Sequence, residues 1–182
     1  MDNREQETEK LTSEEVDAVA NVLKRLKPGF LPLPIFLEVA RLTVTPIVEV
    51  VPLRLGSGGK VEVLLTQREG NDPTWAGLLH TPGTVVRASD EEGGYKDAFK
   101  RIFEGELAGT TIIGEPVLVG GVLHKVKRGM EASQIYWAEV SGESRQGIFY
   151  PVDQLPENII DAQVEFVRNA AKHYAEVKRV SF

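Results

Sequence analysis

Two short apolar segments on either side of a glycine-rich turn are the feature that most constrains this fold. Residues 48–53 and 61–65 are rich in valine and leucine, and residues 56–59 between them read Gly-Ser-Gly-Gly. Aliphatic, β-branched segments of this length that are joined by a glycine turn are typical of a β-hairpin. The sequence therefore predicts an antiparallel pair of strands over residues 48–65.

Helical patterns lie on both sides of this hairpin. Apolar residues recur at helical spacing in the segments 12–26, 34–42, 95–107 and 160–174. The first of these opens with Thr12 and Glu15, which have the spacing of a capping box, and it ends before Lys27-Pro28-Gly29. Residues 1–11 read as a frayed polar tail.

Further strands are predicted between the helical segments. They cover residues 75–81, 85–86, 116–125, 135–140 and 148–152, with a loop over 127–133. Helices that come before, between and after strands indicate an α/β fold with a mixed sheet. We expect a polar tail and helical extension over residues 1–43 and the main domain over residues 44–182.

Composition excludes several classes of function. There are 27 acidic and 21 basic residues, a net charge of −6, so the surface does not favour a nucleic-acid polymer. Cysteine is absent and there are three histidines, which leaves oxygen-ligated Mg²⁺ or Mn²⁺ as the expected metal. No apolar run reaches the ~18–20 residues of a membrane span, and the acidic start is unlike a signal peptide. We expect a cytoplasmic protein that does not bind membranes.

One region combines motifs that carry chemistry. Gln67-Arg68 ends a strand, Trp75 and Pro82-Gly83 follow, and the helix over 95–107 carries Glu104 and Glu106 near its end. This order resembles the Nudix hydrolases, in which an α/β/α sandwich carries the pattern Gly-x5-Glu-x7-Arg-Glu-U-x-Glu-Glu-x-Gly-U, where U is a bulky aliphatic residue. The resemblance implies cleavage of a nucleoside diphosphate linked to another moiety, with Mg²⁺ held by helix glutamates.

The pattern is degenerate, and two registers fit it. In one, Glu92 and Glu104 fall on glutamates of the pattern. In the other, Arg101 falls on its arginine and Glu106 on its last glutamate. The second register resembles the branch of GDP-mannose mannosyl hydrolases, whose helix has a reduced carboxylate set.

Helix geometry favours Glu106 as the carboxylate that faces a ligand. Phe99, Ile102, Phe103 and Glu106 share the apolar face, at i, i+3, i+4 and i+7. Glu104 lies on the opposite face and is the alternative metal ligand. Its structural role would be a surface ion pair with Lys100. The structural role of Glu106 would be a cap or an ion pair at the helix end.

Other site residues are assigned with their alternatives. Glu106 and Glu143 are the candidate catalytic residues, and the resemblance adds the Gly83 carbonyl to them as a third metal ligand. Arg68 suits a phosphate or a structural ion pair, while His80 is a substrate contact or a hydrogen-bonded strand residue. Arg128 is a minor substrate candidate beside its ion pair with Glu131, and Trp75 is expected to anchor the core.

Two classes of function follow from these residues. The first is a Mg²⁺-dependent Nudix-type hydrolase of a nucleoside diphosphate derivative with a reduced carboxylate site. The second is a catalytically inactive protein of the same fold that binds a nucleotide metabolite or serves as a dimeric structural module. In both cases we expect a homodimer, because two helices precede the first strand and can pack on a second copy.

Overall fold

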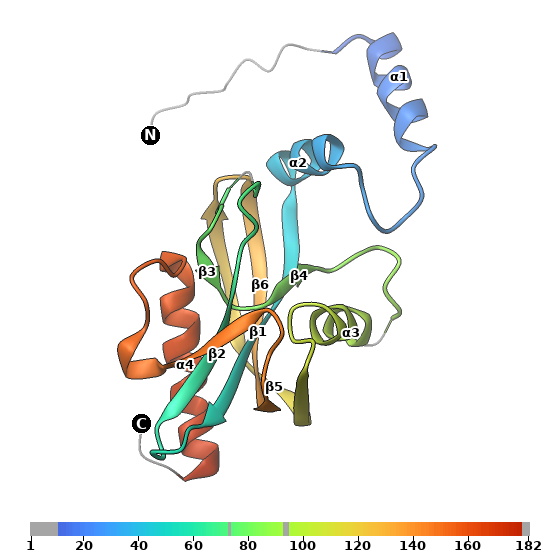
Figure 1. Ribbon diagram of the computed structural model, residues 1–182. Coiled ribbons are helices and arrows are strands. Elements are labelled where there is room, and N and C mark those ends of the chain that lie inside the picture. Colours follow the sequence, from blue (N-terminus) through green and yellow to red (C-terminus); the bar gives the residue numbers. More distant parts are fainter. Residues whose placement is uncertain (1–10, 73, 93–94, 180–182) are drawn as a thin grey trace, which may run out of the picture.

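A seven-stranded mixed sheet forms the centre of the computed structural model, which describes residues 11–72, 74–92 and 95–179 (Figure 1). The strands are β1 (Val44–Leu55), β2 (Val61–Gln67), β3 (Leu79–His80), β4 (Gly83–Val85), β5 (Thr110–Val126), β6 (Gly129–Gly142) and β7 (Gly147–Pro151). The helices are α1 (Ser13–Leu23), α2 (Leu33–Leu42), α3 (Lys96–Glu104), the short η1 (Val152–Gln154) and α4 (Asp161–Lys178). The α/β architecture with a mixed sheet that the sequence predicts is therefore confirmed.

Strand β1 is central to the sheet. It runs parallel to β6 from Val44 to Leu53, and its other edge is shared between two antiparallel partners. Residues 53–55 pair with β2, which forms the predicted hairpin, and residues 47–49 pair with β4. Because β1 and β2 pair only near their turn, residues 79–85 enter between them further along, pairing first with β2 through β3 and then with β1 through β4.

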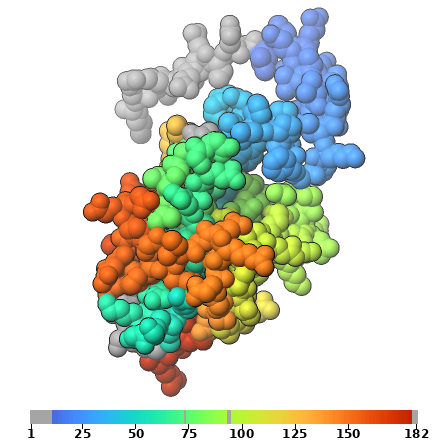
Figure 2. All heavy atoms as spheres, viewed as in Figure 1, coloured from blue at the N-terminus to red at the C-terminus, as the bar shows by residue number. Residues whose placement is uncertain are grey.

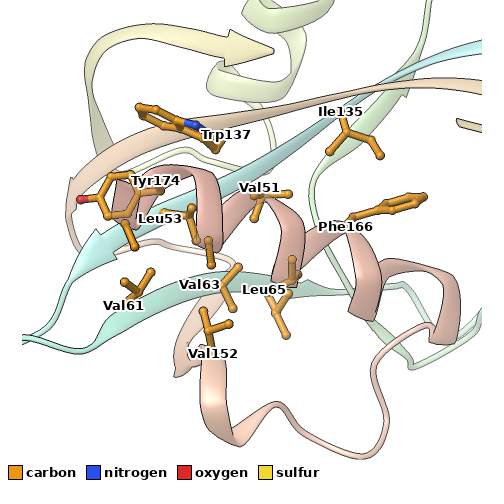
Figure 3. Packing of buried hydrophobic residues seen from close by; sticks show 14 of the residues in the cluster. Val51, Leu53, Val61, Val63, Leu65, Ile135, Trp137, Val152, Phe166 and Tyr174 are labelled. Carbon is orange, nitrogen blue, oxygen red and sulfur yellow. The ribbon is translucent and has the colours of Figure 1, made fainter. Parts of the chain in front are cut away.

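Each face of the sheet is covered by a helix with its own apolar cluster. On one face, Phe166 and Tyr174 of α4 pack against Val51, Leu53 and Leu65, as Figure 3 shows. On the other face, Ala98 and Ile102 of α3 pack against β1, β2 and β6. The strand residues alternate between these two clusters, as the period of two in a strand requires. The result is an α/β/α sandwich.

The structure corrects three of the predicted boundaries. The strand predicted over 75–81 is wrong before Leu79, because the Asp72 carboxylate accepts the backbone N–H groups of Thr74 and Trp75 at 2.8 Å and holds a turn there. The helix predicted to reach Leu107 ends at Glu104, with Gly105 as its C-cap. The loop predicted over 127–133 is a tight turn, because β5 continues to Val126 and β6 begins at Gly129.

The N-terminal helices begin as predicted. In the capping box before α1, the Glu15 N–H donates to Thr12 Oγ1 at 3.2 Å and the Thr12 N–H donates to the Glu15 carboxylate at 2.8 Å. Most of the predicted polar tail, residues 1–10, lies outside the described residues. Among the helices that the structure describes, none is long and apolar enough to cross a membrane.

A carboxyl group lies inside the sandwich. Glu49 of β1 is 7% exposed, and its Oε2 accepts hydrogen bonds from Thr81 Oγ1 at 3.2 Å and from Gln163 Nε2 of α4 at 3.5 Å. Burial raises the pKa of Glu49 to about 8, against the opposing attraction of the Arg68 charge. The side chain is therefore neutral at physiological pH and ties β1 to α4 and to the segment before β4.

The α3 cluster yields a stability prediction. Ile102 is 2% exposed beneath α3, so Ile102→Ala leaves a cavity and should lower the free energy of unfolding by about 2–5 kcal/mol. Lys100→Ala is the matched control, because it places the same residue on the exposed side of the same helix and should cost less than about 0.5 kcal/mol. Urea unfolding followed by circular dichroism measures both. Equal losses for the two variants would contradict this packing.

Glu49 predicts how stability depends on pH. Its pKa is higher in the folded chain than the ordinary 4.5, so its contribution is complete below pH 4.5 and is lost as the pH rises to about 8. Over this window the loss is at most roughly 1.4 kcal/mol per pH unit. In urea unfolding at pH 5 and pH 8, Glu49→Gln should lose less stability between the two than the wild type. Glu104→Gln, on the surface, should keep the wild-type pH dependence, and the same slope for all three proteins would refute the burial of Glu49.

Candidate functional site

A cleft of about 410 Å³ opens where β2 and β3 meet the loop that follows β2. This volume suits a small ligand. The sequence predicts three of its lining residues, Arg68, His80 and Glu106, although they are up to 38 positions apart. The cleft is lined by Leu33, Thr66, Gln67, Arg68, Glu69, Asn71, Asp72, His80, Glu106 and Gln146.

Glu106 points into this cleft, although it does not belong to the helix. Past the Gly105 cap, the Leu107 N–H donates to the Ile102 carbonyl at 3.0 Å, and this turn places Glu106 on the side of α3 that faces the sheet. Its Oε2 accepts a hydrogen bond from Thr66 Oγ1 of β2 at 3.1 Å, and its side chain is 29% exposed. Burial raises its pKa, while the Arg68 charge, Thr66 and the Gly83 N–H oppose the rise.

His80 faces the same carboxyl group as a neutral ring. Burial, followed by the charge of Arg68, lowers its pKa to about 3. Its Nδ1 lies 2.7 Å from the Thr81 carbonyl, which only accepts hydrogen bonds, so Nδ1 carries the proton. Nε2 is then an acceptor that lies 3.1 Å from Thr66 Oγ1 and 3.2 Å from Glu106 Oε2, so the neutral ring forms no ion pair with the carboxyl group.

Arg68 is the cation of the cleft. Its Nη1 lies 3.9 Å from the Asp72 carboxylate, and its side chain is 26% exposed. Its Nε is buried and has no hydrogen-bond partner among the described residues. An unsatisfied, buried N–H on a guanidinium is costly, so the position of Arg68 is maintained against this cost by its other contacts.

A stack of rings and guanidinium groups supports Arg68. Its guanidinium carbon lies 5.7 Å from the centroid of the Trp75 ring, and Arg128 lies 5.3 Å from the same centroid. Arg128 is also 5.6 Å from the Phe36 ring of α2 and pairs with Glu131 at 2.6 Å. The prediction of Trp75 as a core anchor is therefore wrong, because cation–π contacts with two arginines hold it outside both apolar clusters. Arg128 does not line the cleft.

Gly83 lies close to both carboxyl groups of this region. Its backbone N–H lowers the pKa of Glu106, and its carbonyl stays a predicted metal ligand. A Cβ at this position would lie 2.5 Å from Glu49 Oε2. Glycine is required here because the buried Glu49 carboxyl occupies the space of a side chain.

Three other candidate carboxylates lie outside the cleft. Glu143 is 88% exposed and lies 3.6 Å from Arg54, so the expected convergence of Glu143 with Glu106 and Gly83 does not occur. Glu104, at the end of α3, and Glu92, in the loop before it, are both exposed. Arg101 pairs with Asp90 through two hydrogen bonds and donates to the Val85 carbonyl at 3.0 Å.

The donor set does not fit a resident metal ion. Within residues 11–72, 74–92 and 95–179, no group of three or more acidic or histidine side chains is arranged to hold one. Of the carboxyl groups near the cleft, Glu49 is neutral, Asp72 serves Arg68 and a turn, Glu106 contacts Thr66 and His80, and Glu69 is exposed. Mg²⁺ takes octahedral oxygen ligands, and these side chains do not form such a group by themselves.

Sequence reasoning missed two residues that shape the site. Thr66 donates to Glu106, and Glu49 lies beneath Gly83. Glu49 interrupts an otherwise apolar strand, Ile47-Val48-Glu49-Val50-Val51, and an acid within such a pattern is a signal that was available. Thr66 carries no comparable signal, because threonine is ordinary in a strand.

Comparison with known proteins relies on structure. The sequence matches no protein-family model, and it matches no curated protein. The resemblance to the mannosyl hydrolase branch therefore stays a prediction.

Solved structures share the architecture. The NUDIX domain of NrtR from Shewanella oneidensis, solved in complex with ADP ribose, has a TM-score of 0.58 and 18% identity, covering 85% of this chain and 97% of that one. A mutT/nudix family protein from Listeria innocua has a TM-score of 0.56 and 17% identity, covering 75% and 98%. The MutT NUDIX hydrolase from Burkholderia pseudomallei has a TM-score of 0.52 and 23% identity, covering 68% and 97%. The chain therefore has the Nudix fold, as its motifs implied.

Proposed function

We propose that this chain binds a nucleoside diphosphate derivative in the cleft without metal-dependent hydrolysis. The observation that carries the proposal is the position of a cation, Arg68, in a cleft beside Glu106 and a neutral His80. Arg68 presents positive charge to a diphosphate, and within the described residues no cluster of acidic side chains is arranged to hold a hydrolytic metal ion. The ADP ribose bound by the Shewanella domain supports this class of ligand.

Each part of such a ligand has a matching group in the cleft. The Arg68 guanidinium is planar and suits two oxygens of a phosphate, and its side chain is 26% exposed at the cleft. Asn71, Gln67 and Gln146 supply amide donors and acceptors for sugar hydroxyl groups. In this proposal the stack of Trp75 and Arg128 keeps the Arg68 guanidinium in place.

Hydrolysis is the second candidate, and one observation favours it. Glu106 lines the cleft and Gly83 lies near it, which supports the Mg²⁺ or Mn²⁺ site that the resemblance to Nudix hydrolases implies. One side chain leaves most metal ligands to the diphosphate and water. The assembly that we propose for either function is a homodimer.

Binding of ADP-ribose tests the proposed function. By isothermal titration in the presence of EDTA, the wild type should bind ADP-ribose. Arg68→Gln should weaken binding by about 10- to 100-fold, the value of a charge-assisted hydrogen bond to phosphate, and Arg68→Lys should lose less. Arg168→Gln, which removes an exposed charge on α4, is the matched control and should bind like the wild type.

The substitution Glu106→Gln distinguishes the two candidate functions, because its expected effects on binding and on turnover differ. If no metal is involved, Glu106→Gln should leave the affinity for ADP-ribose unchanged or raise it, because it removes a group that repels phosphate when ionised. If the chain is a hydrolase, it should convert ADP-ribose to AMP and ribose 5-phosphate when Mg²⁺ is added, and Glu106→Gln should abolish this turnover. Chromatography of the products with and without Mg²⁺ decides between them, and turnover by the wild type would overturn the binding proposal.

A further inference from the structure

Helix α1 carries an apolar stripe that nothing in the rest of the described chain covers. Val16, Val19, Ala20 and Leu23 recur at i, i+3, i+4 and i+7, so they share one face of the helix. Val16, Val19 and Leu23 are 50%, 54% and 46% exposed, and no residue of α1 is buried. Figure 1 shows that α1 stands away from the sheet, beyond α2, and Figure 2 shows it on the outside of the molecule.

A helix of this length needs a surface to pack on. It has 11 residues, and isolated helices shorter than ~12–15 residues are marginal in water. The capping box of Thr12 and Glu15 sets its start, but a cap contributes only about 1 kcal/mol. The sequence thus specifies a helix whose stabilising contact lies outside its own domain.

The charges of α1 indicate which surface covers the stripe. Acidic residues gather at the start of the helix, at Glu14, Glu15 and Asp17. Basic residues follow its end, at the C-cap Lys24 and at Arg25 and Lys27 beyond it. A second copy of the same helix, turned end to end, brings each acidic end beside a basic end, so the helix complements itself in the antiparallel direction.

The apolar residues fit the same arrangement. In an antiparallel pair centred between Val19 and Ala20, Val16 lies opposite the partner's Leu23, and Asp17 lies on the same flank as the partner's Lys24. Both contacts occur twice, as the twofold symmetry of an isologous interface requires. A parallel pair would instead bring the two acidic helix ends together and the two basic ends together.

We propose that α1 is a homodimerisation helix that packs antiparallel against α1 of a second copy of this chain. This helix pair would be the contact surface of the homodimer proposed above. Its test measures mass and does not depend on ligand binding, so either proposal can fail without the other.

Two substitutions of matched charge test the stripe. Val19→Asp puts a carboxylate in the middle of the apolar face, and Ala18→Asp adds the same charge next to it on the opposite face. By sedimentation equilibrium, the wild type should be a dimer, Val19→Asp should raise the dimer dissociation constant by at least ten-fold, and Ala18→Asp should not. A monomeric wild type, or equal effects of the two variants, would overturn the proposal.

Two charge variants test the partner. Asp17 and Lys24 flank the stripe on one side, so Asp17→Lys makes that flank positive at both positions and Lys24→Glu makes it negative at both, while Glu15 keeps its capping role. Each variant alone should be mostly monomeric, and an equimolar mixture should form heterodimers. If each variant alone still dimerises as the wild type does, α1 does not pair with itself.

Cross-linking tests the direction, because the chain has no cysteine of its own. An antiparallel pair brings Val16→Cys of one copy close to Leu23→Cys of another, within reach of a disulfide. Under mild oxidation, a mixture of the two variants should therefore cross-link, and Val16→Cys alone should not. Cross-linking of Val16→Cys alone, with none in the mixture, would mean a parallel pair and would contradict the proposed interface.

Discussion

The divided edge of β1 is the constraint on which the rest of the structure depends. One edge pairs along its length with parallel β6, while the other pairs with β2 at one end and with β4 at the other. The opening between β1 and β2 admits the segment that contains His80, Thr81 and Gly83. The cleft lies beside this opening, so the position of its polar groups follows from strand pairing rather than from any one motif.

Two carboxyl groups lie close to that segment, and burial raises the pKa of both. Glu49 is held below Gly83 in the apolar interior and stays neutral. Glu106 lines the cleft, where Thr66 donates to it and His80 lies beside it. Among the described lining residues Arg68 supplies the positive charge, and Glu69 and Asp72 lie in the same lining.

Much of the fold could be predicted from local patterns. The hairpin, the capped first helix and the long closing helix follow from the period of apolar residues and from turn and cap residues, which act over a few positions. The predicted ends of helices and strands were wrong where a single contact overrides the pattern of apolar residues. Asp72 turns the chain before Leu79, and Gly105 stops α3 before Glu106. Glu106 still points inward, because the turn after the cap keeps it on the side that the helical pattern predicted.

The candidate site was predictable only in part. Arg68, His80 and Glu106 were found because the order of their motifs resembles a known family, and the fold brings them together. Glu143 was wrong as a partner, because strand β6 carries it to a solvent-exposed end beside Arg54. Glu49 was missed, because an acid in a strand reads as a solvent-facing residue until both faces of that strand are known to be covered.

The sequence by itself determined the fold class, the elements and the chemical types at the site, since these depend on composition and on spacing over a few residues. The tertiary structure alone decided which carboxyl groups are buried, which hold a proton, and which lie at the surface. The physical reason is that the ionisation of an acid depends on desolvation and on neighbours from distant parts of the chain. Here Glu49 on a strand, Gly83 at the start of another and Glu106 after a helix lie close together, although 57 positions separate the first from the last.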